Sequence, residues 1–336
     1  MKNDSSGLAQ KAEKLIAQHG MINAENNVLV AFSGGSDSSA LLFFLFEYMQ
    51  KKQNLFAAHV NHMIRGDESE RDELFSVEIC ERYGIKIFTK RIDVPKIARD
   101  SKKGLEEAAR DERYAFLREV AESLGKNTKI ATAHTASDNA ETLIFNLARG
   151  CGLLGLSGIA PTNKNIIRPL LSCEKEDILS YLKKNNIAYA KDSTNADEGY
   201  TRNFIRHNIT KKLKDKFAKS DENIFKATQI VRETADFMDA LAQGLINESG
   251  EAELGDLLTR HKALQRAVIA KLYENAVFPD NKKLEYRHIA CIESFLEKAE
   301  KSEKSLDMPG LVTVRIANGK LKMEKSQDKK TSRNRS

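Results

Sequence analysis

The sequence predicts an α/β protein in which a doubly wound, Rossmann-like parallel sheet is followed by a helical connector and a small α+β C-terminal domain. Two observations predict the sheet: a strand, glycine turn and helix within residues 28–48, and strand and helix signals that alternate over the first two-thirds of the chain. A third predicts the C-terminal domain, because Asn318-Gly319 separates two alternating runs and is a strong hairpin signal.

The N-terminal elements follow from short apolar runs, each leading into a helical pattern. The expected strands are residues 28–32, 55–60, 85–92 and 129–133. The helices expected after the last three of them are residues 68–83, 105–124 and about 137–148. Ligands of such sheets bind beyond the carboxyl ends of the strands. The motifs Ser33–Ser38, His59–His62 and Thr132–His134 all fall there, so we expect one shared site.

The second half of the chain is mainly helical. The expected helices are residues 173–185, a basic helix at 200–217, and 222–246, 261–275 and 285–298. Two strands, residues 311–317 and 320–324, would form the hairpin. We therefore expect a catalytic domain at 1–217, the connector at 218–250, the small domain at 251–324 and a basic, disordered tail at 325–336.

Composition excludes several classes of protein. Of 336 residues, 41% are hydrophobic and 30% charged, as in soluble globular proteins. No run approaches the roughly 20 apolar residues of a membrane span, and the N-terminus has no apolar signal core, so we expect a cytoplasmic protein. The four cysteines form no CxxC pair, which argues against a zinc site or an iron–sulfur cluster.

The most informative motif is the loop after the first strand. Its residues are Ser33, Gly34, Gly35, Ser36, Asp37 and Ser38. A strand, a glycine turn and a helix start gather free backbone N–H groups and positive helix dipole at one point, which favours an anion such as phosphate. No Gly-Lys-Ser/Thr follows, so the loop is not the P-loop of kinases and GTPases. A Ser/Gly-rich helix cap is the simpler alternative.

Basic residues are concentrated in two segments. Residues 202–219 contain a single acid, Asp215. Their basic residues are Arg202, Arg206, Lys211, Lys212, Lys214, Lys216 and Lys219. The segment 325–335 holds five further basic residues. Such clusters commonly meet nucleic-acid phosphates. A solvated helix face and a frayed tail are the alternative interpretation.

Several blocks of the sequence carry a family resemblance. SGGSDS resembles the pyrophosphate-binding loop of the N-type ATP pyrophosphatases. Within that superfamily the chain resembles the tRNA(Ile)-lysidine synthetases in five further blocks, taken in the family's order: residues 59–73, 104–117, 132–150, 168–171 and 192–209. The hairpin region PGLVTVRIANGKLKME looks like the end of the family's first C-terminal domain. Longer members carry a second such domain, for which we expect no room here.

The resemblance implies a reaction. Free L-lysine would be joined through its side-chain amine to C2 of the wobble cytidine in an isoleucine tRNA, after ATP adenylates the C2 oxygen and releases pyrophosphate. This chemistry needs an anion cradle and Mg²⁺. The loop would supply the cradle, and Asp37 and Asp138 the carboxylates for the metal. Glu141 lies one helical turn after Asp138 and could bind the lysine ammonium or accept its proton.

The remaining candidate residues are assigned more loosely. By resemblance, Arg113 faces the reacting centre, although a surface pair with a nearby glutamate is an equal alternative. We expect the backbone around Val60 to contact adenine. His59 and His62 point to opposite faces of a strand, which argues against a shared metal ion, and His134 fits a structural role. Arg202 and Arg206, with the lysines at 211, 212, 214 and 216, are candidate tRNA contacts.

Two rival functions remain open from sequence. A tRNA cytidine thiolase of the same fold would use a similar loop, ATP and tRNA, but would need paired cysteines. A non-catalytic nucleotide- or tRNA-binding module would not need Asp37, Asp138 and Glu141. A homodimer is possible, although no heptad pattern marks an interface.

Overall fold

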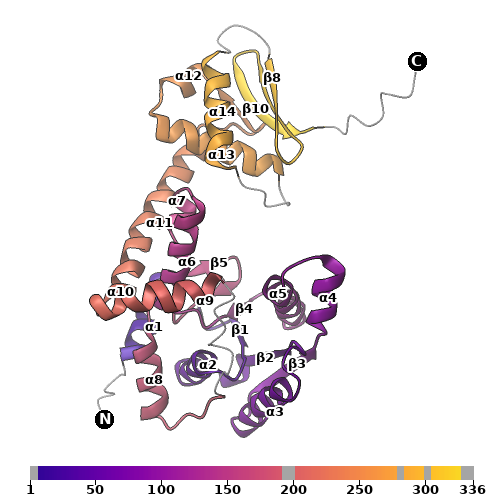
Figure 1. Ribbon diagram of the computed structural model, residues 1–336, viewed down its shortest axis with the longest axis vertical. Helices are drawn as coiled ribbons and strands as arrows, with labels where there is room; N and C mark the ends of the chain where they lie inside the picture. Colours follow the sequence, from indigo (N-terminus) through magenta and orange to yellow (C-terminus); the bar gives the residue numbers. More distant parts are fainter. Residues whose placement is uncertain (1–6, 191–200, 278–283, 299–303, 327–336) are drawn as a thin grey trace, which may run out of the picture. The chain divides into compact units, whose positions relative to one another are not determined.

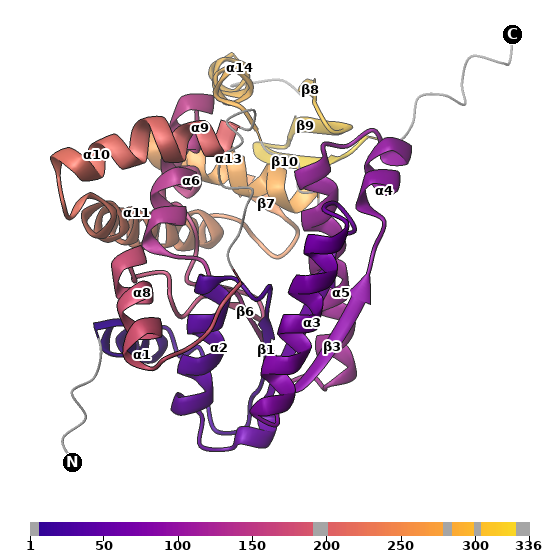
Figure 2. The ribbon, with the colours of Figure 1, turned by 60° about the horizontal axis from the view of Figure 1, so that its bottom comes forward.

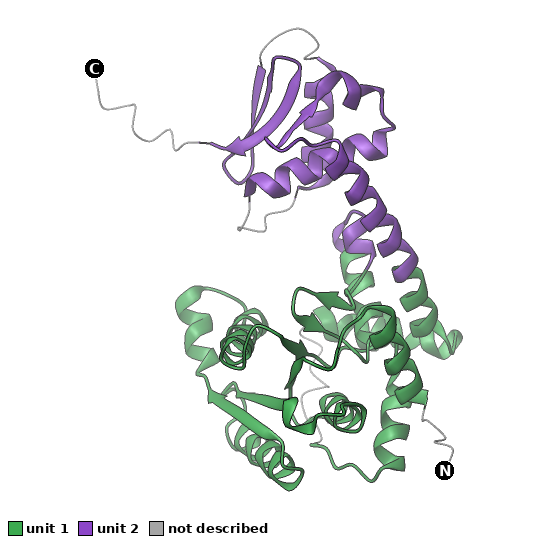
Figure 3. Ribbon diagram, turned by 180° about the vertical axis from the view of Figure 1, so that it is seen from behind, with its two compact units in different colours: residues 1–148, 158–228 green, residues 149–157, 229–336 purple. Residues whose placement is uncertain are grey.

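The computed structural model describes residues 7–190, 201–277, 284–298 and 304–326. The chain divides into two compact units, residues 1–148 with 158–228, and residues 149–157 with 229–336 (Figure 3). The first unit holds most of the residues that the sequence singles out as chemical. Of the expected block 192–209, residues 192–200 lie outside the described residues, as does most of the expected basic tail.

The first unit is built on a six-stranded sheet in the order β3-β2-β1-β4-β6-β5. Its strands are β1 (Asn27–Ala31), β2 (Leu55–Asn61), β3 (Lys86–Arg91), β4 (Thr128–Ala131), β5 (Thr162–Asn163) and β6 (Ile166–Ile167). All neighbours pair in parallel except β5 with β6. The parallel α/β sheet is confirmed. The β5–β6 hairpin was not expected, because strands of two residues are too short to show a periodic pattern.

Helices cover both faces of this sheet. They are α1 (Gly7–Gln18), α2 (Ser36–Tyr48), α3 (Asp67–Arg82), α4 (Val94–Ser101), α5 (Leu105–Ser123), α6 (Ala136–Arg149) and α8 (Lys175–Lys184). Val28 and Val30 share a core with α1, α2 and α8, whereas Leu29 and Ile130 pack with α5. In Figure 1, α4 and α5 lie on the opposite side of the strands from α2 and α3. Successive residues of β1 are therefore buried on opposite faces of the sheet, as the doubly wound arrangement requires.

The basic segment forms three short helical pieces where the sequence predicts one helix. These are α9 (Thr201–Ile205), a π-helical turn (Arg206–Thr210) and α10 (Lys211–Lys216). Single π turns occur often at functional sites. This segment lies beside α6 in both Figure 1 and Figure 2, and Arg206 contacts Glu141 of α6. The chain continues into the long helix α11 (Ser220–Gly244).

The second unit contains an antiparallel sheet in the order β7-β10-β9-β8. Its strands are β7 (Glu251–Glu253), β8 (Lys304–Met308), β9 (Val312–Ala317) and β10 (Lys320–Lys325), and its helices include α7 (Leu153–Leu156), α12 (Leu254–Thr259), α13 (Lys262–Val277) and α14 (Tyr286–Glu297). Asn318 and Gly319 both have positive φ, as a two-residue hairpin turn requires. Among the described residues, no helix is both long enough and apolar enough to cross a membrane.

Candidate active site

The loop between β1 and α2 is shaped by close packing and by its own serines. Gly34 adopts φ +81°, and a Cβ there would lie 3.1 Å from Ser76 Oγ and 3.2 Å from a Phe75 ring carbon. Ser38 Oγ accepts a hydrogen bond from Ser33 N at 3.3 Å and donates to the Gly35 carbonyl at 3.0 Å. The first N–H groups of α2 have no carbonyl partner within the helix. They are therefore available to an anion.

A cavity of about 430 Å³ opens next to this loop. Its lining includes six residues predicted from the sequence, namely Ser33, Asp37, Ser38, Val60, Arg113 and Asp138. They come from the carboxyl ends of β1 and β2 and from α2, α5 and α6. The structure thus brings together residues about 100 positions apart. Gly34 and Gly35 belong to the adjoining loop, Ser36 is the first residue of α2, and Glu141 lies one turn further along α6 than Asp138.

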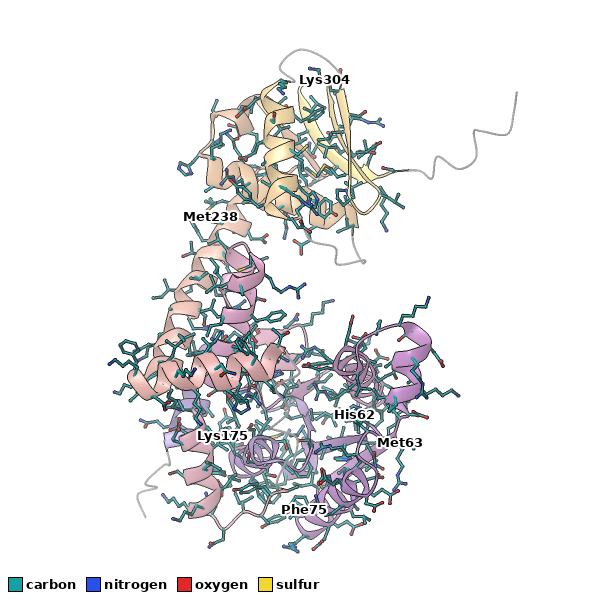
Figure 4. All side chains as sticks on the ribbon, viewed as in Figure 1. His62, Met63, Phe75, Lys175, Met238 and Lys304 are labelled. Carbon is teal, nitrogen blue, oxygen red and sulfur yellow. The ribbon has the colours of Figure 1, made fainter. Side chains whose placement is uncertain are left out.

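Asp37 is held by a lysine that the sequence did not single out. Lys175, at the start of α8, donates to the Asp37 carboxylate at 2.5 Å and to Ser36 Oγ at 2.8 Å. Figure 4 labels Lys175 and the cavity residue His62. Both partners of the ion pair are partly open to solvent, with side-chain exposures of 43% and 37%. The lysine cation therefore lies at the loop's anion-binding face and can exchange partners at small cost.

Asp138 is fixed at the start of α6. One carboxylate oxygen accepts hydrogen bonds from the backbone N–H and the hydroxyl of Thr135, both at 2.8 Å. The other lies 3.6 Å from a guanidinium nitrogen of Arg206. Negative charge in the first turn is favoured by the helix dipole. That simpler role and a metal-binding role are compatible, because Asp138 also lines the cavity.

Glu141 forms the most buried ion pair of the site. Its side chain is 2% exposed and accepts two hydrogen bonds from Arg206, at 2.6 and 3.0 Å. Burial raises the pKa of Glu141, and the bonds from Arg206 oppose that rise. Arg206 also approaches Asp138, so one guanidinium serves both carboxylates of α6. The sequence assigned Arg206 to tRNA or nucleotide, and the structure places it on these carboxylates.

Burial lowers the pKa of each of the three histidines near the cavity, His59, His62 and His134. Burial lowers the pKa of His59, whose Nδ1 lies 3.0 Å from the Phe32 carbonyl. Burial, together with the charge of Arg113, lowers the pKa of His62 to about 4. His134 meets Thr132 Oγ1 at 2.9 Å, and its pKa is lowered by burial and by surrounding arginines. The expected structural role of His134 fits this contact.

The groups present suit an adenine nucleotide and a magnesium ion. His62 Nδ1 and Asp72 Oδ1 are buried without hydrogen-bond partners among the described residues, so the cavity has polar groups ready for a ligand. The volume is that of a small-molecule site. Asp37 and Asp138 offer the oxygen ligands that Mg²⁺ prefers. No described group of three or more His, Cys, Asp or Glu side chains could hold a metal alone, so phosphate and water would complete its shell.

The lysines of the basic segment differ in their surroundings. Lys214 is half-buried and pairs with Glu176 at 2.6 Å and with Asp221 at 3.8 Å. Lys211, Lys212 and Lys216 are exposed and form no ion pair within the described part of the chain. Arg202 pairs weakly with Glu106, at 3.4 Å. Lys214 thus has an intramolecular role, whereas Lys211, Lys212 and Lys216 are open to a partner.

Two residues of the site escaped the sequence interpretation. Lys175 reaches the loop because α8 packs against α2 and because Ala190 N donates to the Gly34 carbonyl at 2.8 Å, which draws the chain after α8 onto the loop. Asp72 reaches the cavity from α3. Asp72 lies in the block 59–73, which resembles the family. Six other acidic and basic residues in that block gave no reason to choose Asp72 among them.

Residues 5–213 match the family model of the PP-loop domain. The chain belongs to this family. Curated PP-loop relatives named tRNA(Ile)-lysidine synthase include one from Pseudothermotoga lettingae, 46% identical over 60% of this chain and 45% of the relative. Another, from Caldanaerobacter subterraneus, is 34% identical over 90% of this chain and 66% of the relative. The resemblance to this family is confirmed, and the chain spans between about half and two-thirds of the length of these relatives.

A solved structure supports the fold. A U34-tRNA thiolase from Methanococcus maripaludis, described with its 4Fe-4S cluster, superposes with a TM-score of 0.54 at 22% identity. The match covers 67% of this chain and 78% of the thiolase. At this identity the likeness shows the shared Rossmann-like fold and nothing about the reaction.

Proposed function

We propose that this protein is an ATP-dependent ligase that attaches free L-lysine to C2 of the wobble cytidine of an isoleucine tRNA. The observation that carries the proposal is the cavity that joins the PP-loop to Asp37, Arg113 and Asp138. Curated relatives of this chain are named tRNA(Ile)-lysidine synthase.

The first step activates the base. The C2 oxygen of cytidine would attack the α-phosphorus of ATP, and the bond from that phosphorus to the bridging oxygen would break, releasing pyrophosphate. The loop and the start of α2 would hold the phosphates, and the Arg113 guanidinium would steady charge on the α-phosphate. Asp37 and Asp138 would hold Mg²⁺, which neutralises phosphate charge when bound. Lys175 could then leave Asp37 for the phosphates.

The second step forms the new carbon–nitrogen bond. The neutral side-chain amine of lysine would attack C2, and the bond from C2 to the adenylated oxygen would break, so that AMP leaves. The amine must lose protons on the way. Glu141 is the candidate group, because burial raises its pKa and so improves its ability to take a proton. Its alternative role is to bind the lysine ammonium.

The wobble base must leave the anticodon stack for its C2 atom to be reached. The exposed lysines of the basic segment, Lys211, Lys212 and Lys216, would contact RNA phosphates, which position the RNA without reading its sequence. These residues belong to the same compact unit as the cavity.

The thiolase alternative is disfavoured by the cysteines of this unit. Cys80 and Cys173 are both buried, and burial raises the pKa of each thiol to about 12. Such thiols stay protonated and are poor nucleophiles and metal ligands. No described cluster of cysteines could hold an iron–sulfur cofactor.

Mass spectrometry of a wobble-cytidine isoleucine tRNA, incubated with the protein and ATP, tests the proposal. With L-lysine present, the wobble nucleoside should gain the mass of lysine less one water. Without lysine, the expected product is an adenylated tRNA and pyrophosphate. A sulfur-for-oxygen mass change would favour the thiolase, and an unmodified tRNA with no pyrophosphate would favour a binding module.

A further inference from the structure

A second pocket, of about 300 Å³, shares Tyr114 with the active-site cavity. Three arginines line it: Arg110 and Arg118 on α5, and Arg168 just after β6. The rest of its lining is Asp111, Tyr114, Asn163 and Ile166. None of the loop residues that would hold the phosphates of ATP lines this pocket. It is therefore a separate cationic site on the same unit.

The three arginines have no carboxylate partner in the described part of the chain. None of them forms an ion pair there, and Arg110 instead stacks on the Tyr114 ring at 5.0 Å. The one acid of the pocket lining, Asp111, is already bound to Lys103 at 2.6 Å. An arginine cluster without counter-charge is complementary to an anion.

Arg168 is the buried base of this pocket. It is 6% exposed, and one of its terminal nitrogens donates to the Ala160 carbonyl at 2.6 Å. Its Nε is buried and has no hydrogen-bond partner among the described residues. A buried, unpaired N–H of a cation carries a high desolvation cost, which a bound anion would recover.

The positive potential of this region also reaches the cavity. Burial and, to a smaller extent, the charge of Arg110 lower the pKa of Arg168, and the Tyr114 side chain opposes that change. Burial lowers the pKa of His134 well below its ordinary value, and Arg168, Arg110, Arg113 and Arg202 add to that effect. These cations repel one another, and a bound anion would relieve that repulsion.

We propose that the pocket of Arg110, Arg118 and Arg168 binds one phosphodiester group of the RNA, close to the nucleotide whose base enters the cavity beyond Tyr114. This inference rests on the proposed function and adds to it the place where the anticodon loop is gripped. Arg110 and Arg118 are exposed, so an RNA backbone can reach them from solvent. Their planar guanidinium groups match phosphate oxygens in pairs.

The first experiment measures binding of an anticodon stem–loop RNA by fluorescence anisotropy at several salt concentrations. The variant Arg110→Gln/Arg118→Gln should bind roughly tenfold more weakly, since charged hydrogen bonds are removed. Its dependence of log affinity on log salt should flatten by about 0.7, the value for one single-stranded phosphate contact. The matched control, Arg99→Gln/Lys126→Gln, removes two exposed charges that line neither pocket and should bind as the wild type does.

The second experiment locates the phosphate. A set of stem–loops, each with one neutral methylphosphonate in the loop, is bound to the wild type and to the arginine variant. One substitution next to the wobble nucleotide should weaken binding to the wild type about tenfold and leave binding to the variant unchanged.

Three results would overturn the inference, and they separate it from the proposed function. The arginine variant could keep the RNA affinity and salt slope of the wild type while the wild type still transfers lysine. That result would refute the phosphate site and leave the proposed function standing. Weaker ATP binding with normal RNA binding would make the pocket part of the nucleotide site. A wild type that binds no RNA would overturn both proposals.

Discussion

The carboxylates of the active site are ion-paired, whereas the three arginines of the neighbouring pocket are not. Asp37 is paired with Lys175, and Arg206 bridges Asp138 and Glu141. By contrast, Arg110, Arg118 and Arg168 form no ion pair among the described residues, and the acid beside them, Asp111, pairs with Lys103. In the proposed reaction, Asp37 and Asp138 would exchange these protein cations for Mg²⁺. For the arginines, the RNA phosphate proposed above would supply the balancing charge.

The largest effect is expected from Asp37→Asn, which tests the paired carboxylates. Pyrophosphate release should fall by about a thousandfold, because a neutral amide cannot compensate phosphate charge through Mg²⁺. The fold should persist, since the Asp37 side chain is 37% exposed. Steady-state pyrophosphate release and a thermal melt check both points. Near-normal turnover would show that Asp37 is not a ligand of the metal ion.

The variant Glu141→Gln separates the two steps of the proposed reaction. If Glu141 handles the lysine amine, adenylation should be nearly normal and lysine transfer should slow by about a hundredfold. Rapid-quench analysis should then show adenylated tRNA accumulating. An equal loss in both steps would mean that Glu141 acts by holding Arg206 in place.

Arg206→Ala tests whether the buried pair is structural. Removing Arg206 leaves the carboxylate of Glu141 buried and unpaired, at a cost of about 2 kcal/mol in the free energy of unfolding at about pH 7.5. The control Arg202→Ala breaks only an exposed pair and should cost less than about 1 kcal/mol. Both values come from urea unfolding.

The loss of stability caused by Arg206→Ala should be larger at high pH than at low pH. Without Arg206, burial is the main influence on Glu141, so its folded pKa lies above its unfolded value. The folded variant then binds more protons than the unfolded chain, and its stability falls as pH rises. The defect should therefore shrink at about pH 5. A defect that is constant with pH would exclude an ionised Glu141 as its cause.

Neutralising exposed lysines should have a smaller effect, which is limited to the affinity for RNA. The variant Lys211→Gln/Lys212→Gln should flatten the salt dependence of tRNA binding by roughly 0.7 to 0.9 for each phosphate that is no longer neutralised. Discrimination among wobble bases should not change, because phosphate contacts carry no base information. The exposed lysines Lys51 and Lys52, replaced by Gln, are the matched control. An unchanged salt dependence would mean that Lys211 and Lys212 lie on a solvated helix face and contact no RNA.

The last effect concerns His62 and appears only as the pH falls below neutral. Its folded pKa is about 4 against an ordinary value of 6.5, so the unfolded state binds more protons between these values. Its contribution to stability is present above pH 6.5 and is lost as pH falls toward about 4. In His62→Gln, the free energy of unfolding should fall by about 1 to 3 kcal/mol less over this range than in the wild type. Identical pH profiles in urea unfolding would contradict this.

Local sequence predicted the parallel sheet and the residues at its rim. Asp37 and Asp138 could be found because each directly follows a strand and a turn, and the ends of parallel strands meet at one edge. The same reasoning missed the β5–β6 hairpin and the π turn at Arg206. Two-residue strands carry no periodic signal, and a π turn differs from an α-helix by one residue per hydrogen bond, which composition does not encode.

The sequence by itself determined the strand–loop–helix units, the Asn318-Gly319 hairpin and the acidic and basic groups available to the site. Those features depend on backbone propensity and on neighbours within a few residues. Only the tertiary structure decided which charges pair: Lys175 with Asp37, Arg206 with Glu141, and Arg168 with no carboxylate in the described part of the chain. Coulomb interactions depend on distance in space and on burial, and both arise from how helices pack on the sheet.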